Sequence, residues 1–135
     1  MTNQDVINSA LFELMAISQG QTPQATESAD MLAKLNQMMA AWAMQDKDIG
    51  FPPQTVLTAS CPIPVWAEMG VICNLAIYAA SSFVNGVVTN TLLSKADEGM
   101  RLIGNKLISL NRQPSDMSHL PMGRGRWRHN ITTDI

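Results

Sequence analysis

The sequence predicts an all-α fold, a four-helix antiparallel bundle with an extended proline-rich excursion between the second and third helices and an irregular C-terminal arm. Three observations lead to this prediction. Apolar residues recur at three- and four-residue spacing in four segments, proline and glycine interrupt the chain between them, and the pattern stops after Asn111. A chain of 135 residues can bury a core, so we expect one helical domain, 1–111, followed by the arm, 112–135.

The first two helices have recognisable start and stop signals. Thr2 is a suitable N-cap, and Asp5 in the first turn complements the helix dipole. This helix is expected to end near residues 18–20, because a glycine there adopts the left-handed conformation that closes helices. Pro23 suits the first position of a second helix, which should run to about Gln45.

The inner part of the second helix, 31–42, carries a broad apolar stripe. Its main members recur three and four residues apart: Leu32, Leu35, Met39 and Trp42. A helix with such a face is stable only when the face is buried against other helices. We therefore expect the stripe to hold the other three helices together.

The segment 49–64 changes character, because four prolines prevent a continuous helix there. We interpret it as an extended excursion that could include a short strand at 55–58. One interpretation is a surface connector. A connector of this length without its own helix is unusual in a compact domain, however, and often contacts a ligand or partner.

The third helix, about 65–83, is apolar nearly all round, so it either spans a membrane or lies at the centre of the fold. Its uncharged part, 69–84, is shorter than the roughly 20 residues that a membrane span needs, and it contains Asn74. We therefore predict a buried central helix.

The fourth helix shows a packing seam along its whole length. The seam consists of Leu93, Ala96, Met100, Ile103, Leu107 and Leu110. Gly99 and Gly104 lie inside this helix, where each costs about 1 kcal/mol relative to alanine. We expect them to permit a close backbone approach, the alternative being a local weak point. The predicted core residues of the whole chain are Leu11, Leu32, Leu35, Met39, Trp42, Trp66, Cys73, Ile77, Ile103 and Leu107.

No catalytic constellation is recognisable. The chain lacks a nucleotide-binding glycine loop, a nucleophile elbow and the zinc-protease helix motif, and we predict no cofactor and no metal site. His119 and His129 have no cysteine at ligand spacing. Glu13 and Glu68 lie on or beside apolar helices, where an acid role is conceivable, but solvated helix-end or interface carboxylates are far commoner. Two cysteines without a paired motif indicate a reducing compartment for synthesis.

Charge separates the helical domain from the arm. Residues 1–111 carry five basic and nine acidic side chains, a net charge of −4, whereas the arm carries four against two, a net charge of +2. The arm interleaves arginine with glycine and one tryptophan at 123–128. Such residues grip phosphates and stack on bases in single-strand binders. They equally serve as anchors in a partner protein, so the residues alone leave both interpretations open.

The order of these segments resembles a known viral family, the head-to-tail adaptors of tailed bacteriophages. The likeness is to the tail accessory factor, or packaged-DNA-stabilisation protein, of short-tailed phages. It covers about residues 5–128. The matching features are Ala10-Leu11 with Leu14, the Leu-x-x-Met-Met-Ala-x-Trp pattern at 35–42, Asn74-Leu75-Ala76, and Leu120-Pro121-Met122-Gly123.

The resemblance implies a virion protein that forms a homo-oligomeric ring of twelve subunits beneath the portal protein. Such a ring extends the DNA channel without sequence-specific binding, retains the packaged genome and carries the next tail or nozzle protein. Subunits would be made in the host cytoplasm, and no membrane is involved. On this analogy the arm docks on the portal through Arg112, Arg124, Arg126, Trp127 and Arg128. We place the excursion at a contact with a neighbouring subunit, through Phe51, Val56 and Leu57, with the portal and the tail as the alternative partners.

Two further expectations concern activity. One member of that family is credited with peptidoglycan hydrolysis, which requires two carboxylates facing a sugar. Spacing identifies no such pair here, so we predict that the chain is not an enzyme. The alternative function is a small helical nucleic-acid-binding module that uses the basic arm.

Overall fold

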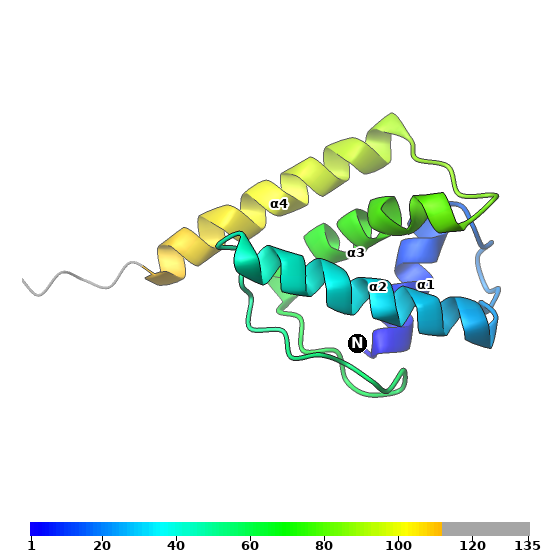
Figure 1. The fold of residues 1–135 in the computed structure, drawn as a ribbon. Coiled ribbons are helices and arrows are strands. Elements are labelled where there is room, and N and C mark those ends of the chain that lie inside the picture. Colours follow the sequence, from blue (N-terminus) through cyan, green and yellow to red (C-terminus); the bar gives the residue numbers. More distant parts are fainter. Residues whose placement is uncertain (112–135) are drawn as a thin grey trace, which may run out of the picture.

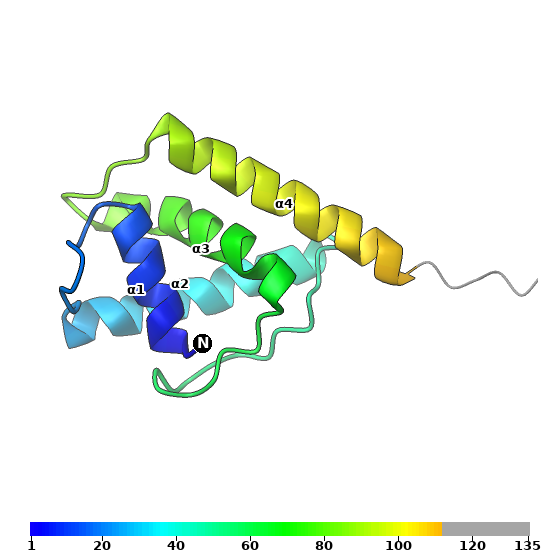
Figure 2. The same ribbon diagram turned by 180° about the vertical axis from the view of Figure 1, so that it is seen from behind.

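The computed structural model describes residues 1–111 and is helical, with no strand in that range (Figure 1). The helices are α1 (Asn3–Glu13), α2 (Ala25–Met44), α3 (Val65–Ala79), which continues into the 3₁₀ turn η1 (Ala80–Ser82), and α4 (Asn90–Asn111). The predicted all-α class is confirmed. α2 and α4 each run antiparallel to α3, which lies between them, while α1 crosses at a steep angle (Figures 1 and 2).

The start of α1 is as predicted, whereas that of α2 is not. Thr2 and Asp5 form a reciprocal capping box, in which each backbone N–H donates to the other's side chain at 2.8 and 3.2 Å. α2 begins at Ala25, two residues later than predicted. The residue that caps it is Gln24, whose N–H donates to Glu27 Oε2 at 2.9 Å, so Pro23 precedes the helix instead of opening it.

α1 also ends earlier than predicted, at Glu13. Met15 has a positive φ of 59°, which turns the chain away from the helix axis. The Leu14 carbonyl then accepts a hydrogen bond from Val87 N at 2.9 Å, a partner far along the chain. The turn therefore depends on tertiary structure, and the helix stops well before the glycine at position 20.

α3 is the central helix, as predicted, because α1, α2 and α4 all pack against it. By length and composition alone, Val65–Ser82 would also qualify as a membrane span, with a mean hydropathy of 1.2. Core helices of soluble proteins meet the same criterion. The α2 stripe is buried beside α3, and Leu32, Leu35, Met39 and Trp42 all belong to the core.

Most of the predicted core residues are buried in the structure. The fully or nearly fully buried ones are Leu11, Leu32, Leu35, Met39, Trp42, Cys73 and Ile103. Trp66, Ile77 and Leu107 are only half-buried and pack against the edge of the core.

α3 and α4 approach each other most closely where Gly70 faces Gly99. A Cβ atom added to Gly99 would lie 2.4 Å from Gly70 Cα, so any side chain there collides with backbone. Gly104 is different, since a Cβ there would meet nothing within 4 Å. The predicted close approach is thus confirmed at Gly99 and wrong at Gly104.

The predicted α4 seam is shifted at both ends. The α4 residues buried toward α3 are Leu92, Ala96, Gly99 and Ile103. Contact through Gly99 fixes the helix rotation, so that Leu92 lies on the contact line and Leu93 turns outward. Leu110 is exposed although it shares the rotation of Leu92, because α4 at that level extends beyond Val65, the first residue of α3.

The segment between α2 and α3 forms neither helix nor strand, and the strand expected at 55–58 is wrong. Backbone hydrogen bonds tie this segment to the beginning of α1 instead: Asn3 N to Ala59 O at 3.0 Å and Gln4 N to Leu57 O at 2.9 Å. These N–H groups belong to the first turn of α1, and the N–H groups of a first turn have no carbonyl acceptor within their own helix. The segment therefore completes the helix end.

Asn36 of α2 fixes the same segment from the other side. Its Nδ2 donates to Gln54 O at 2.7 Å, and its Oδ1 accepts from Gln54 N at 2.9 Å. We expect Asn36→Ala to lower the free energy of unfolding by about 1–3 kcal/mol, because both Gln54 backbone groups lose a part-buried partner. Urea unfolding measures this change, with exposed Gln37→Ala on the same helix as the control. Equal stability of the two variants would contradict the role of Asn36.

Candidate functional site

An open groove of about 780 Å³ lies between α1, the loop that follows it, and α3, with one residue of α4 at its edge. We call it the α1–α3 groove; Figure 2 shows the side of the molecule on which α1 crosses α3. Its apolar lining residues are Phe12, Ile17, Met69, Ile72 and Cys73, and its polar and charged ones include Asn8, Ser9, Glu13, Gln21, Glu68 and Lys95. An apolar concave surface with a few polar groups is the usual form of a binding site.

The floor of the groove is apolar and uncovered in residues 1–111. Phe12 is 49% exposed although it lies on a helix next to the core, and Met69 is also exposed. The cause is the rotation of α1, because Phe12 lies off the buried face that Val6, Ile7, Ala10 and Leu11 form. Such a combination of an aromatic ring and a methionine suits an adaptable apolar contact.

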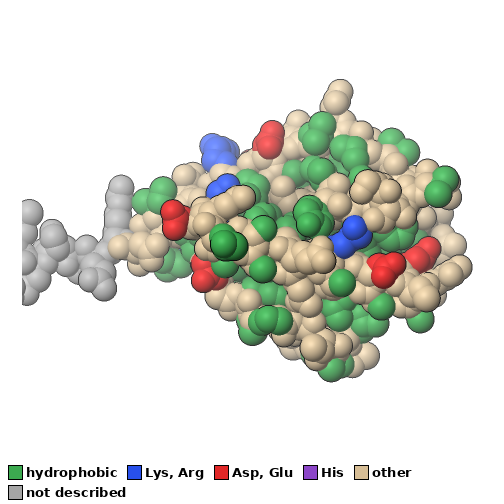
Figure 3. Space-filling model, viewed as in Figure 1, with side chains coloured by type: hydrophobic (Ala, Val, Ile, Leu, Met, Phe, Trp, Pro, Cys, Tyr) green, Lys and Arg blue, Asp and Glu red, His purple; other side chains and the backbone are tan. Residues whose placement is uncertain are grey.

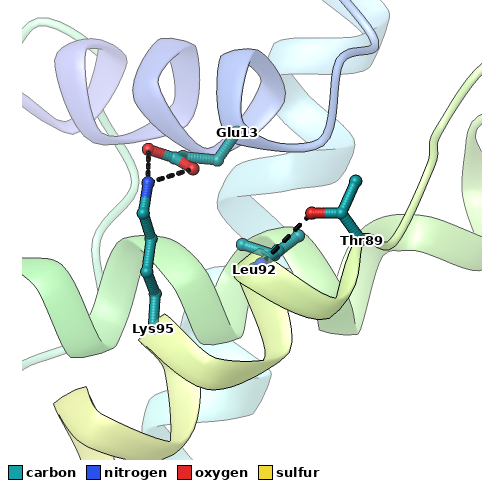
Figure 4. Close-up of polar contacts among 4 residues, drawn as sticks. All are labelled: Glu13, Thr89, Leu92 and Lys95. Carbon is teal, nitrogen blue, oxygen red and sulfur yellow. Dashed lines mark hydrogen bonds and ion pairs between the residues drawn. The ribbon is translucent and has the colours of Figure 1, made fainter.

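An ion pair crosses the edge of the groove and joins α1 to α4. Lys95 Nζ lies 3.0 Å from both carboxylate oxygens of Glu13 (Figure 4). The hydrogen bond from Lys95 to Glu13, together with the charge of that carboxylate, raises the pKa of Lys95 above its ordinary value of 10.5. Glu68 forms no ion pair with another residue in 1–111. It gives the groove one uncompensated negative charge within that range.

The raised pKa of Lys95 makes a testable contribution to stability at high pH. Because the folded pKa exceeds the unfolded one, the stabilisation is present below about pH 10.5 and is lost as pH rises through the folded value. We expect Lys95→Met to remove the part of the stability loss at high pH that comes from deprotonation of Lys95. Thermal melts from pH 8 to about pH 12 compare it with Lys106→Met, an exposed lysine of the same helix, which should keep the wild-type slope. Identical slopes for both variants would contradict the effect.

Both cysteines are buried free thiols. Burial raises the pKa of Cys61 to about 11 and also raises the pKa of Cys73, which lies beneath the groove. Since the thiolate is the reactive form, neither thiol is set up for nucleophilic chemistry near neutral pH.

The three predicted intersubunit residues of the excursion differ in how far they are exposed. Phe51 and Leu57 are half-buried and pack against the core, so much of their surface is already used within the subunit. Val56 is 53% exposed and is the one of the three that presents most of its side chain outward. The proposed portal-contact residues, Arg112, Arg124, Arg126, Trp127 and Arg128, lie outside the described residues.

Sequence reasoning missed the groove, although it singled out two residues that line it. Glu13 and Glu68 are far apart in the sequence, and the structure brings them to the same groove. Lys95 engages both oxygens of Glu13, which makes that carboxylate part of a structural ion pair. Within residues 1–111, no group of three metal-ligating side chains comes together. The periodic apolar face of α1 excludes Phe12, and this is the sequence signal that could have marked Phe12 as exposed.

No protein-family model and no curated protein matches the chain. The resemblance to bacteriophage adaptors therefore stays a prediction from the sequence.

Proposed function

We propose that this protein is a structural head-to-tail adaptor of a tailed bacteriophage and has no catalytic role. In this proposal an antiparallel helical bundle carries the excursion 49–64 and the C-terminal arm at its surface. Twelve subunits form a ring beneath the portal protein, extend the DNA channel, retain the packaged DNA and offer the attachment platform for the next tail component. Assembly begins in the host cytoplasm and the ring ends in the virion.

The observation that carries this proposal is the overhanging end of α4. α3 starts at Val65, only five residues before its crossing point at Gly70, whereas α4 continues twelve residues beyond Gly99 to Asn111. At 1.5 Å per residue, α4 extends about 10 Å past the start of α3, and Figure 2 shows this projection. Ile108 and Leu110 on it are 60% and 59% exposed. An apolar helix end of this kind is suited to packing against a neighbouring subunit.

The surface composition supports an assembled state as well. Charged residues make up only 15% of the chain, below the usual quarter or so of soluble domains. On the face seen in Figure 3, charged side chains are few and lie scattered among apolar and uncharged polar ones. Subunit interfaces are depleted in charge in the same way. With Phe51 and Leu57 packed inward, we assign the excursion's contribution to the interface chiefly to Val56.

The proposal assigns the arm to the portal on the resemblance to the bacteriophage adaptors, and the arm's arginines and tryptophan are residue types that anchor protein contacts. The test is co-sedimentation with the portal protein encoded in a neighbouring reading frame. We expect the full chain to bind, deletion of 112–135 to abolish binding, and Trp127→Ala to weaken it while sparing the fold. Full portal binding by the deleted chain would overturn the assignment.

The isolated chain is expected to sediment largely as a monomer, since ring formation would wait for the portal. A stable ring without portal would contradict that order of assembly. A salt-dependent mobility shift with single-stranded DNA, lost on deletion of 112–135, combined with no portal binding, would favour the nucleic-acid-binding alternative.

A further inference from the structure

We propose that the α1–α3 groove binds segment 122–128 of the chain's own arm, Met-Gly-Arg-Gly-Arg-Trp-Arg, in the free subunit. Neither the proposed ring contact at the end of α4 nor the portal contact of the arm uses this groove. Three features favour this occupant: the apolar floor, the charge at the edge of the groove, and the length and starting point of the chain that follows α4.

The floor of the groove matches the one aromatic residue of the arm. Phe12 and Met69 present exposed apolar surface beside half-buried Ile72. The indole of Trp127 offers a large flat apolar surface, and a methionine thioether packs favourably against such a ring. Asn8 and Ser9 on the polar wall supply acceptors of the kind that a buried indole N–H requires.

Charge favours the same occupant. Glu13 is paired with Lys95, so Glu68 is the groove's carboxylate without an ion pair within 1–111. The arm segment carries three arginines at 124, 126 and 128 and no acidic residue. An arginine next to a tryptophan that enters the groove lies within reach of Glu68, and arginine binds carboxylates through two parallel hydrogen bonds. The overall charges, −4 for 1–111 and +2 for the arm, act in the same direction.

The arm also starts in a suitable place and is long enough. A second, apolar hollow of about 410 Å³ lies beside the end of α4 and is lined by Trp66 and Leu102. Trp66 and Met69 are three residues apart on α3 and therefore neighbours on one face, so the hollow and the groove border the same face of α3. From Asn111 back to the level of Lys95 is about 24 Å along α4. Sixteen extended residues, from 112 to 127, span up to about 50 Å.

Docking in the groove has a consequence for assembly, and this consequence rests on the proposed function. If portal and groove bind the same arginine and tryptophan side chains, the two contacts exclude each other. The free subunit would then keep its arm folded back until a portal competes for it.

Paramagnetic relaxation in the full-length protein tests the docking. A nitroxide label is placed on Asn130→Cys, just beyond the segment, while the buried thiols of Cys61 and Cys73 remain unlabelled. We expect the backbone amide signals of Phe12 and Met69 to lose most of their intensity. Charge reversal by Glu68→Lys should restore them, and Arg126→Glu in the same chain should bring the loss back. Glu98→Lys, an exposed acid on α4 outside the groove, is the matched control and should leave the loss unchanged.

A mixing experiment identifies which chain supplies the arm. Spin-labelled protein without nitrogen-15 is mixed with nitrogen-15 protein that carries no label. We expect no intensity loss in the mixture, because each groove is filled by its own arm. Equal loss in the mixture would assign the arm to a second copy and overturn the proposal, as would no loss in the singly labelled chain. Portal co-sedimentation is a separate measurement. Portal binding without intensity loss at Phe12 and Met69 would defeat the docking inference alone. Intensity loss at these residues without portal binding would defeat the adaptor function alone.

Discussion

Gly99→Ala is expected to lower the free energy of unfolding by about 3 kcal/mol or more. The added methyl carbon would lie 2.4 Å from Gly70 Cα and 2.8 Å from Gly70 N, both backbone atoms that cannot rotate out of the way. The helices can accept it only by moving apart, which opens the packing between Ala96, Ile103 and α3. Thermal and urea unfolding of the variant measure the loss.

Gly104→Ala is the matched control for this prediction. It places the same side chain in the same helix, five residues further on, where nothing lies within 4 Å. Alanine is the better helix former, so this variant should be more stable than the wild type by about 1 kcal/mol. If both variants lost stability equally, a general intolerance of α4 to substitution would explain the result, and the close crossing at Gly99 would not.

Trp42→Ala is expected to cost about 3–5 kcal/mol, since it leaves a large cavity in the core. The Trp42 side chain is only 7% exposed and closes the apolar stripe of α2. Met44→Ala, two residues further along the same helix, is the control, because Met44 is 89% exposed and should change stability little. Urea unfolding compares the two variants. A larger loss for Met44→Ala would mean that the end of α2 is buried differently from the structure described.

The same substitution in the arm separates stability from attachment. Trp127→Ala should leave the melting temperature of the helical domain nearly unchanged and weaken portal co-sedimentation. If Trp127→Ala lost as much stability as Trp42→Ala and still bound the portal fully, Trp127 would be a core residue and the assignment of the arm to the portal would be wrong.

Periodicity predicted the helices and most of the core, because burial of an apolar face leaves a spacing that can be read along the chain. Periodicity did not separate Gly99 from Gly104, since a glycine permits a close helix contact only where it faces the neighbouring helix. Leu92 and Leu93 illustrate the same limit. The helix rotation that buries one and exposes the other is fixed by the Gly70–Gly99 contact, which joins two helices.

The α1–α3 groove could not be predicted, because it results from where α1 ends. Glu13, Leu14 and Met15 carry no stop signal, and the turn depends on the hydrogen bond from Val87 to Leu14. The arm, in contrast, was recognisable by composition alone. Its arginines and tryptophan indicate an interaction segment but do not specify the surface that receives it.

The hydrogen bonds between the beginning of α1 and the segment before α3 have a consequence for the order of folding. Asn3 N to Ala59 O and Cys61 N to Met1 O join residues 56 and 60 positions apart, whereas α3 and α4 follow one another directly. Closing the longer loop costs more chain entropy, so the α3–α4 pair should form first. Pulsed hydrogen exchange during refolding should protect α3 and α4 before α1, and the opposite order would contradict this. α1 would then leave the ribosome before α3 and α4 and take its final place after them.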